Sequence, residues 1–186
     1  MSASLSPNPS PKLNDTLADF LRQNPQFQRL VVSAVIIHRD KLLIVQRSAD
    51  EVSYRNKWEI PGGSVDPSDP SIRDALVREV FEETGLHVDK ILTERMGNGT
   101  VFRTGRRNHM KTWLKNSYVV EVRRGSWDNP VAVTLDPKEH QNFLWVTKEQ
   151  VLRDDVDGYR LEFVSEEQKN VMLLGFEAWK DVWKQT

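Results

Sequence analysis

The spacing of apolar residues predicts strands in the first half and the middle of the chain. Apolar runs within 30–37 (LVVSAVII) and 41–48 (KLLIVQRS) are typical of two buried strands, and the polar pair at 39–40 predicts a turn between them. Apolar and polar residues alternate over 88–97 and 112–122, which predicts two more strands. The basic stretch that separates these last two segments is predicted to be a loop.

A helical period is found near both ends of the chain. Residues 14–22 are predicted to form a short amphipathic helix. Thr147 with Gln150, and Ser165 with Gln168, are capping-box patterns that predict two further helix starts. The helix after Ser165 carries a stripe of large apolar residues that we expect to pack on the core, with a dimer face as the alternative: Met172, Phe176, Trp179 and Trp183.

The most strongly marked helix is predicted over residues 70–84. Asp69 is a favoured N-cap residue, Pro70 suits the first helical position, and Gly85 is common just after a helix end. At about 3.6 residues per turn, four apolar residues fall on one stripe that must face the core: Ile72, Ala75, Leu76 and Val80.

Two glutamates, Glu79 and Glu83, fall inside this apolar stripe, and Glu82 lies at its edge. A carboxylate that faces the core is costly unless a positive group meets it, and neighbouring carboxylates raise one another's pKa. A divalent cation removes both costs, and oxygen ligands favour Mg2+ or Mn2+. The alternative is a solvated helix face with an i,i+4 pair between Arg78 and Glu82.

Strands that alternate with helices on both sides of a sheet predict an α/β/α sandwich with a mixed sheet. The 186 residues suffice for one domain with a sizeable core, and residues 13–186 are assigned to it. Residues 1–12 are rich in serine and proline with little to bury, and we expect them to be disordered.

Composition narrows the classes of function. The 26 Lys and Arg nearly balance the 27 Asp and Glu, so no global field recruits DNA or a membrane surface. The absence of cysteine excludes disulfides, zinc–thiolate sites and thiol nucleophiles. No long apolar run resembles a signal peptide or a membrane span. We therefore expect a cytosolic or nuclear protein, by default a cytoplasmic one.

The segment 58–86, WEIPGGSVDPSDPSIRDALVREVFEETGL, resembles the signature of the Nudix hydrolase family. Gly63 opens the box, and REVFEETGL over 78–86 closes it without a mismatch. One departure is visible, because Asp69 stands where the first glutamate of the box is expected and Pro70 adds one residue before the helix. Since Asp-Pro is a strong helix start, we expect the loop to absorb this residue without rotating the glutamates off their face.

The resemblance implies an enzyme that holds a divalent ion, Mg2+ or Mn2+, against a diphosphate. Carried over to this chain, Glu79 and Glu83 would be the principal metal ligands, and Glu82 would share the ion or hold a second one. The carbonyl of Gly62 would be a backbone ligand. Arg78 would orient the glutamates, because arginine stays cationic and does not bind metal.

Many enzymes of this family supply an extra acid from outside the box, as a further metal ligand or as a general base. Glu139, which with His140 precedes the segment FLWV, resembles that position, and Asp136 is a competing candidate. The predicted general base is therefore Glu82 or Glu139.

Two arginines are candidates for binding substrate phosphates, to which the guanidinium fork is well suited. Arg47 lies at the end of a predicted strand, and Arg103 lies in the basic loop. A surface ion pair for Arg47 and a solvated loop for Arg103 are the alternatives. Phe102 and Trp113 are candidates for stacking on a base, or for the core.

The resemblance implies hydrolysis of a diphosphate linkage in a nucleoside diphosphate joined to some moiety X. We expect a small nucleotide, while a nucleoside triphosphate, a dinucleoside polyphosphate, a nucleotide sugar and an isoprenoid diphosphate all stay open. The rivals are an enzyme repurposed for a biosynthetic prenyl diphosphate and a domain that senses a nucleotide without cleaving it. Retention of all three box glutamates argues against the sensor. A monomer or a homodimer is expected.

Overall fold

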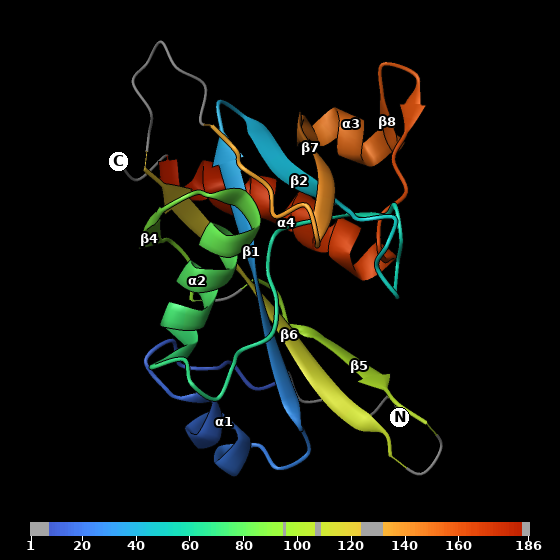
Figure 1. The fold of residues 1–186 in the computed structure, drawn as a ribbon. Helices are drawn as coiled ribbons and strands as arrows, with labels where there is room; N and C mark the ends of the chain where they lie inside the picture. The colour runs from blue at the N-terminus through green and yellow to red at the C-terminus, as the bar shows by residue number, and fades with distance from the viewer. Residues whose placement is uncertain (1–7, 95, 107–108, 124–131, 184–186) are drawn as a thin grey trace, which may run out of the picture.

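The computed structural model describes residues 8–94, 96–106, 109–123 and 132–183, and the side chain of Trp183 lies outside this description. Figure 1 shows the elements along the chain. They are α1 (Leu17–Gln23), β1 (Arg29–His38), β2 (Lys41–Arg47), β3 (Trp58–Glu59), α2 (Ile72–Thr84), β4 (Val88–Ile91), β5 (Thr100–Thr104), β6 (Lys111–Val122), β7 (His140–Val146), α3 (Lys148–Arg153), β8 (Asp155–Val156), β9 (Tyr159–Arg160) and α4 (Glu166–Trp183).

Seven of the strands in the described part of the chain form one mixed sheet with the order β3-β2-β1-β6-β4, to which β5 adds on β6 and β7 adds on β2. Strands β1 and β6 are parallel. The other pairs in this sheet are antiparallel. Strand β1 pairs with β2 only beside the turn, at Ile37–Leu42 and His38–Lys41. The N-terminal part of β1 is therefore free to pair with another segment.

That segment is the loop between β3 and α2. The N–H of Val32 donates to the Gly63 carbonyl at 3.0 Å, and the N–H of Ala34 donates to the Pro61 carbonyl at 2.8 Å. The loop thus runs along the open edge of β1 before it enters α2, so its backbone is held by the sheet.

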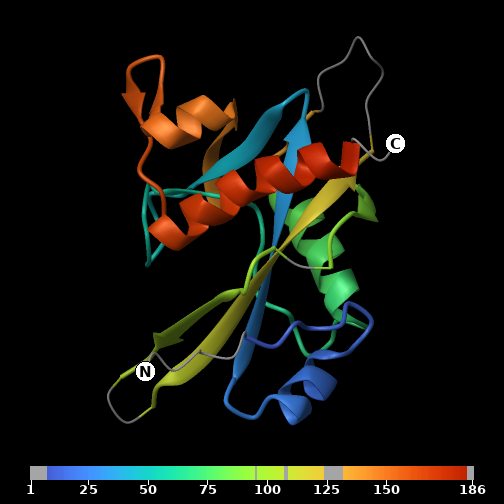
Figure 2. The same cartoon turned by 180° about the vertical axis from the view of Figure 1, so that it is seen from behind.

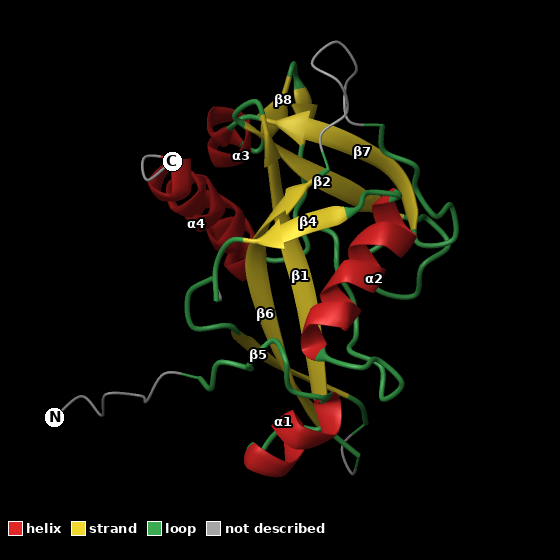
Figure 3. Cartoon of the chain, turned by 90° about the vertical axis from the view of Figure 1, so that its left-hand side faces the viewer, coloured by secondary structure: helices red, strands yellow, loops and turns green. Residues whose placement is uncertain are grey.

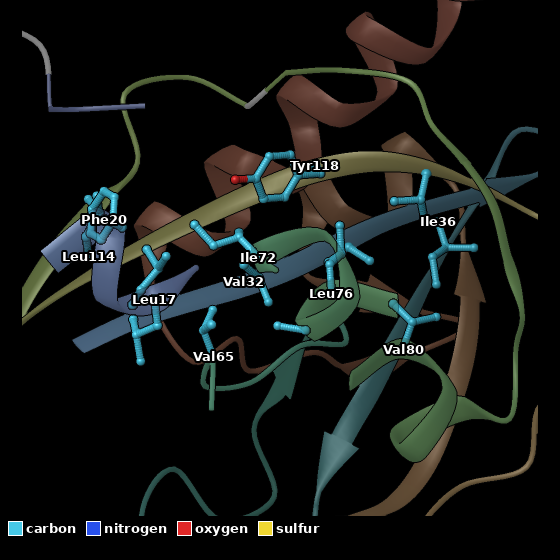
Figure 4. Close-up of a cluster of buried hydrophobic side chains, with 14 of the residues drawn as sticks. Leu17, Phe20, Val32, Ile36, Val65, Ile72, Leu76, Val80, Leu114 and Tyr118 are labelled. Atoms are coloured by element: carbon cyan, nitrogen blue, oxygen red, sulfur yellow. The ribbon is translucent and has the colours of Figure 1, made fainter. Parts of the chain in front are cut away.

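Helices cover both faces of the sheet, α1 and α2 on one and α4 on the other (Figures 2 and 3). The predicted α/β/α sandwich with a mixed sheet is confirmed. Figure 4 shows the cluster beneath α1 and α2, in which helix residues meet alternate residues of β1 and β6. Its labelled members are buried: Leu17, Phe20, Val32, Ile36, Val65, Ile72, Leu76, Val80, Leu114 and Tyr118.

A second cluster lies beneath α4. Met172 and Phe176 are buried there against β1 and β2, and Trp179 packs on the cluster from its margin. The predicted core stripe of this helix is confirmed for these three residues. Trp183, its fourth member, has a side chain outside the described part.

Helix α2 begins two residues later than predicted. Its N-cap is Ser71, whose Oγ accepts a hydrogen bond from the Asp74 N–H at 3.2 Å. The prediction of Asp69 as N-cap is wrong because its carboxylate binds Arg78 and the N–H of Asp66 instead. The helix ends at Thr84, and Gly85 follows with the predicted left-handed backbone, φ 68°.

The stretch predicted as a basic loop contains a strand. Residues 100–104 (TVFRT) form β5, which pairs with β6 in an antiparallel hairpin. The loop prediction was wrong here because an edge strand keeps one edge and much of its surface in water and therefore tolerates charged residues. Strand β4 is shorter than predicted and ends at Ile91.

The predicted disordered tail, residues 1–12, falls partly outside the described residues. Residues 8–12 are placed, with Pro11 buried. Residues 1–7 lie outside the described part. None of the described helices combines the length and the apolar character needed to cross a membrane.

The packing of α4 on β1 generates a prediction. A Cβ atom at Gly175 would lie 2.5 Å from Val35 Cγ1. Gly175→Ala should therefore destabilise the protein by about 1–3 kcal/mol, even though alanine favours a helix by about 1 kcal/mol. Urea unfolding measures the loss.

The same substitution made in a Val35→Ala background should cost less, because the obstructing methyl groups are gone. Fully additive losses would contradict the proposed contact. Leu174→Ala, at an exposed position of the same helix, is the control and should stay within about 0.5 kcal/mol of the wild type.

Candidate active site

The two glycines of the loop are required by close approach. A Cβ atom at Gly62, whose φ is 145°, would lie 2.2 Å from the Val32 carbonyl oxygen. A Cβ atom at Gly63 would lie 2.4 Å from Glu79 Oε2. Any larger residue would push the loop off β1 or push the carboxylate out of its place. The Gly-Gly pair therefore lets the α2 carboxylates come against the loop backbone.

The glutamates of α2 differ in exposure, as the helical spacing predicts. Glu79 and Glu83 are 8% and 4% exposed, whereas the side chain of Glu82 is 55% exposed. Glu83 Oε2 accepts a hydrogen bond from the Gly62 N–H at 2.7 Å. Packing of the apolar stripe thus places two carboxylates inside the protein.

Burial raises the pKa of both Glu79 and Glu83. Burial, together with the charges of Glu59, Glu79 and Glu139, raises the pKa of Glu83 well above its usual range, although the hydrogen bond from Gly62 opposes this. Burial also raises the pKa of Glu79, and the neighbouring Arg78 lowers it. The site therefore concentrates negative charge that only added positive charge can offset.

Arg78 binds carboxylates on both sides of the box. Its Nε and Nη2 donate to the two oxygens of Asp69 at 2.9 and 2.8 Å. Its Nη1 donates to Glu79 at 2.9 Å and to Glu82 at 2.8 Å. Its Nη2 also donates to the Ser64 carbonyl at 3.1 Å. One guanidinium thus joins the loop to the acids of the helix.

Asp69 explains how the chain accommodates its departure from the family signature. Its carboxylate accepts from the Asp66 N–H at 2.7 Å in addition to both bonds from Arg78. Hydrogen bonding to Arg78 lowers its pKa, so it stays a carboxylate despite partial burial. Asp69 acts as an anchor for Arg78, while Ser71 caps the helix.

A second group of charges lies beside Glu83. Glu59, on β3, is buried and receives a hydrogen bond from Arg47 Nη1 at 2.7 Å. Although burial raises its pKa, the neighbouring His140, Lys115 and Arg47 lower it to about 2. Glu59 is therefore an anion enclosed by three basic residues next to the acids of α2.

Arg47, predicted to bind phosphate, lies within this group. It forms ion pairs with Glu59 and with Glu51 Oε2, the latter at 3.0 Å, and its Nε donates to the Ser53 carbonyl at 2.9 Å. The charge of Glu83 also contributes to the raised pKa of Arg47. The structure thus places Arg47 in a partly buried ion pair at the margin of the acid cluster.

Glu139 is brought to the box acids from a distant part of the chain. Carboxylate oxygens of Glu83 and Glu139 and a ring nitrogen of His140 all lie within 4.8 Å of one another. The competing candidate, Asp136, builds the turn before them. Its Oδ1 accepts from the Lys138 N–H at 2.9 Å, and its carbonyl accepts from the His140 N–H at 2.9 Å.

Arg103 and Phe102 are neighbours on β5, so their side chains leave opposite faces of the hairpin. Phe102 stacks on Trp113 with ring centroids 5.6 Å apart, and the guanidinium carbon of Arg29 lies 6.0 Å from the Trp113 ring. Lys115 follows Trp113 on the same face of β6. Arg103 is exposed and pairs with Thr112, away from this row.

Sequence reasoning missed two residues of the site, Glu59 and Lys115. Glu59 lies between the apolar residues Trp58 and Ile60, which is the signal that would have found it. Lys115 lies between Leu114 and Asn116 and carries no such signal. Burial lowers the pKa of Lys115, whereas the charges of Glu59 and Glu83 raise it. Lys115 comes from β6, on the far side of β1, so only the folded sheet brings it to the box.

The residues of this cluster fit a divalent cation. Glu79 and Glu83 are buried carboxylates with raised pKa values. His140 is a buried imidazole for which, in the described part of the chain, neither ring nitrogen has a hydrogen-bond partner. Carboxylates and an imidazole are donors that divalent ions accept, and a cation would relieve the repulsion among the acids.

Comparisons with known proteins agree with the fold and the box. A model of the NUDIX domain matches residues 27–166. A CTP pyrophosphohydrolase of Escherichia coli (strain K12) is 32% identical over 123 residues, which cover 66% of this chain and 78% of that protein. The chain therefore belongs to the Nudix hydrolase family, and the predicted enzyme class, a pyrophosphohydrolase, is confirmed at that level.

Solved structures show the same fold. The MutT NUDIX hydrolase of Burkholderia pseudomallei matches with a TM-score of 0.54 and 20% identity over 77% of this chain and 95% of that one. The NUDIX domain of Shewanella oneidensis NrtR, crystallised with ADP ribose, matches with a TM-score of 0.53 and 19% identity over 92% of this chain and 100% of that one.

The acid cluster generates a stability prediction. Glu83→Gln should raise the unfolding midpoint of the metal-free protein at neutral pH, because it removes a buried negative charge and keeps an oxygen for the Gly62 N–H. We expect a rise of about 2–4 °C, equivalent to about 1 kcal/mol for a domain of this size. Calorimetry in EDTA measures it.

Added Mg2+ should raise the midpoint of the wild type and leave that of the variant almost unchanged. Glu82→Gln, at an exposed position, is the control and should give a smaller shift in EDTA. A lower midpoint for Glu83→Gln in EDTA would show that the carboxylate stabilises the empty site.

Proposed function

We propose that the protein hydrolyses a diphosphate linkage of a small nucleotide, with a divalent ion, Mg2+ or Mn2+, held by the box. Glu79 and Glu83 with the Gly62 carbonyl would be its ligands, and Glu82 would share the ion or hold a second one. The observation that carries this proposal is the burial of Glu79 and Glu83 against a glycine loop, where Glu83 meets other carboxylates. A bound ion would neutralise phosphate charge and acidify the attacking water.

We propose that Arg78 orients the carboxylates of Glu79 and Glu82. Its bidentate bond to Asp69 holds the guanidinium, and its Nη1 reaches both Glu79 and Glu82. Because Arg78 never loses its proton, its charge also opposes the burial that raises the pKa of Glu79. We therefore assign Arg78 a positioning role rather than contact with the reacting phosphorus.

A carboxylate must take the proton of the attacking water. Glu139 is exposed and faces Glu83, whereas Glu82 is exposed with one oxygen held by Arg78. We propose one of these two carboxylates as the base. Arg47, at the margin of the cluster, and Arg103, on β5, are the proposed phosphate contacts. Arg47 would have to exchange one of its carboxylate partners for a phosphate oxygen.

The nucleotide substrate is supported by two observations. The Escherichia coli relative, 32% identical, is named as a CTP pyrophosphohydrolase. The row formed by Phe102, Trp113 and Arg29 also lies on the face of the sheet that carries Lys115, which interacts with Glu83. A diphosphate at the acids would thus leave its nucleoside beside an aromatic row.

The rival proposal of a prenyl diphosphate needs an apolar pocket built from the C-terminal tryptophans. Trp179 instead packs against the core cluster beneath α4, and the side chain of Trp183 lies outside the described part. A measurement of turnover distinguishes the proposed enzyme from the nucleotide-sensing rival. Tight nucleotide binding without phosphate release at any metal concentration would favour the rival.

The experiment that tests the proposal is a substrate panel with released phosphate counted. It would contain the common nucleoside triphosphates, an oxidised purine triphosphate, ADP ribose, a dinucleoside polyphosphate and a prenyl diphosphate, each with Mg2+ and with Mn2+. Cleavage at a diphosphate linkage of a nucleotide supports the proposal. Turnover of the prenyl compound alone would contradict it.

Loss of a box acid should abolish most of the turnover. Glu79→Gln and Glu83→Gln are each expected to lower kcat by more than the roughly 10–100-fold typical of residues that only support a metal ligand, with the fold retained by circular dichroism. Glu149→Gln, an exposed glutamate on α3, is the matched control. A rate near that of the wild type in either box variant would refute the ligand assignment.

Trp113→Ala should raise KM for the best nucleotide by about tenfold, since stacking on a base is worth about 1–3 kcal/mol. Trp113→Phe keeps an aromatic ring and should recover most of the loss. Steady-state kinetics separate KM from kcat. If kcat falls and KM does not change, the ring supports the fold and does not contact the base.

A further inference from the structure

His140 is a buried residue that the proposed mechanism does not use. His140 is 1% exposed. It lies on β7 opposite Arg47, where the register of the β2–β7 pair shifts. Neither ring nitrogen has a hydrogen-bond partner in the described part of the chain. Its Nε2 lies 3.5 Å from Glu59 Oε1, within ion-pair distance. Nδ1 has no hydrogen bond among the described residues, and a buried ring nitrogen in that state is costly, so a missing ligand is the simplest explanation.

The surroundings of the ring indicate what this ligand is. A ring nitrogen of His140 and carboxylate oxygens of Glu83 and Glu139 lie within 4.8 Å of one another. Ligand atoms that are about 2.1 Å from one ion lie within about 4.2 Å of each other. A small movement of the exposed Glu139 side chain would therefore bring all three donors onto one cation.

We propose that His140 supplies a nitrogen ligand to a divalent ion held jointly with Glu83 and Glu139. This inference deepens the proposed function, because Glu83 would be shared with the ion held by Glu79. The site would thus accept two ions of unlike character. One has oxygen donors alone, and the other has an imidazole.

The donor set determines which ion is preferred. Mg2+ takes oxygen ligands and dehydrates reluctantly. Imidazole favours the later divalent ions, and affinity at a nitrogen-containing site rises from Mn2+ to Co2+. The His140 position should therefore prefer Mn2+ or Co2+ over Mg2+. Glu59 would accept the N–H of the ring nitrogen that the ion does not use, and so fix the ring, as carboxylates beside metal-bound histidines do.

The proposal also affects the choice of general base. A carboxylate oxygen that binds an ion has little tendency to take a proton. If Glu139 is a ligand and Glu82 binds no ion, the proton of the attacking water falls to Glu82, whose side chain is 55% exposed and held by Arg78 at only one oxygen. His140 then acts by fixing the second ion and does not itself move the proton.

The direct test is pulsed electron paramagnetic resonance of the full protein loaded with Mn2+. The wild type should show electron spin-echo modulation from a directly bound 14N, and this signal should change to that of 15N when only histidine is labelled. His140→Gln should lose the nitrogen modulation. His87→Gln, at an exposed position where the ring lies against Phe81, is the matched control and should keep it.

A second measurement compares the affinity of the His140 site for Mn2+ and for Mg2+. Competition between Mg2+ and Mn2+ should show the preference for Mn2+ reduced at least about tenfold in His140→Gln, because losing an outer-shell partner alone has an effect of that size. His140→Glu, which offers an oxygen in place of the nitrogen, should restore the number of bound ions without nitrogen modulation. Thermal unfolding of each variant shows that the fold is kept.

Wild-type protein saturated with Mn2+ but lacking nitrogen modulation overturns the proposal, as does modulation that persists in His140→Gln. Both outcomes are independent of turnover. Failure of the proposed function would show as no hydrolysis of any substrate on the panel, whereas failure of this inference would leave Mg2+-dependent hydrolysis intact.

Discussion

The contact between the α2 carboxylates and the glycine loop is the constraint on which the rest of the site depends. Glu83 accepts from the Gly62 N–H, and Glu79 occupies the space that a side chain at Gly63 would need. The loop is held by backbone hydrogen bonds to β1, and α2 is held by its apolar stripe. Two separate parts of the core therefore meet at a pair of carboxylates, and neither part can shift without moving them.

Charge is arranged around this contact in two groups. On one side Arg78 joins Asp69 to Glu79 and Glu82. On the other side Glu59 is enclosed by Arg47, His140 and Lys115, which keep it ionised. Glu83 lies between the groups and faces other acids, so it is the carboxylate that most needs a cation. A buried acid without a full counter-charge destabilises a fold, and such groups are typical of functional sites.

The departure of this chain from the family signature has a structural explanation. Asp69 has a shorter side chain than glutamate and lies before an extra residue, Pro70. It nevertheless reaches Arg78 with both oxygens, because the turn over 66–69 brings it back toward the helix. The helix start moves to Ser71, and the spacing of the acids along the helix is unchanged. Arg78, which the box glutamates require, therefore keeps an acidic partner.

The sequence by itself determined the mixed α/β class, the box and the inward direction of Glu79 and Glu83, because these follow from local periodicity and from motif spacing. Only the tertiary structure decided that Glu59, Lys115 and His140 surround Glu83, since β3, β6 and β7 reach it by strand pairing between residues far apart in the chain. It also decided that residues 100–104 form a strand, because an edge strand is selected by its partner and not by its own composition.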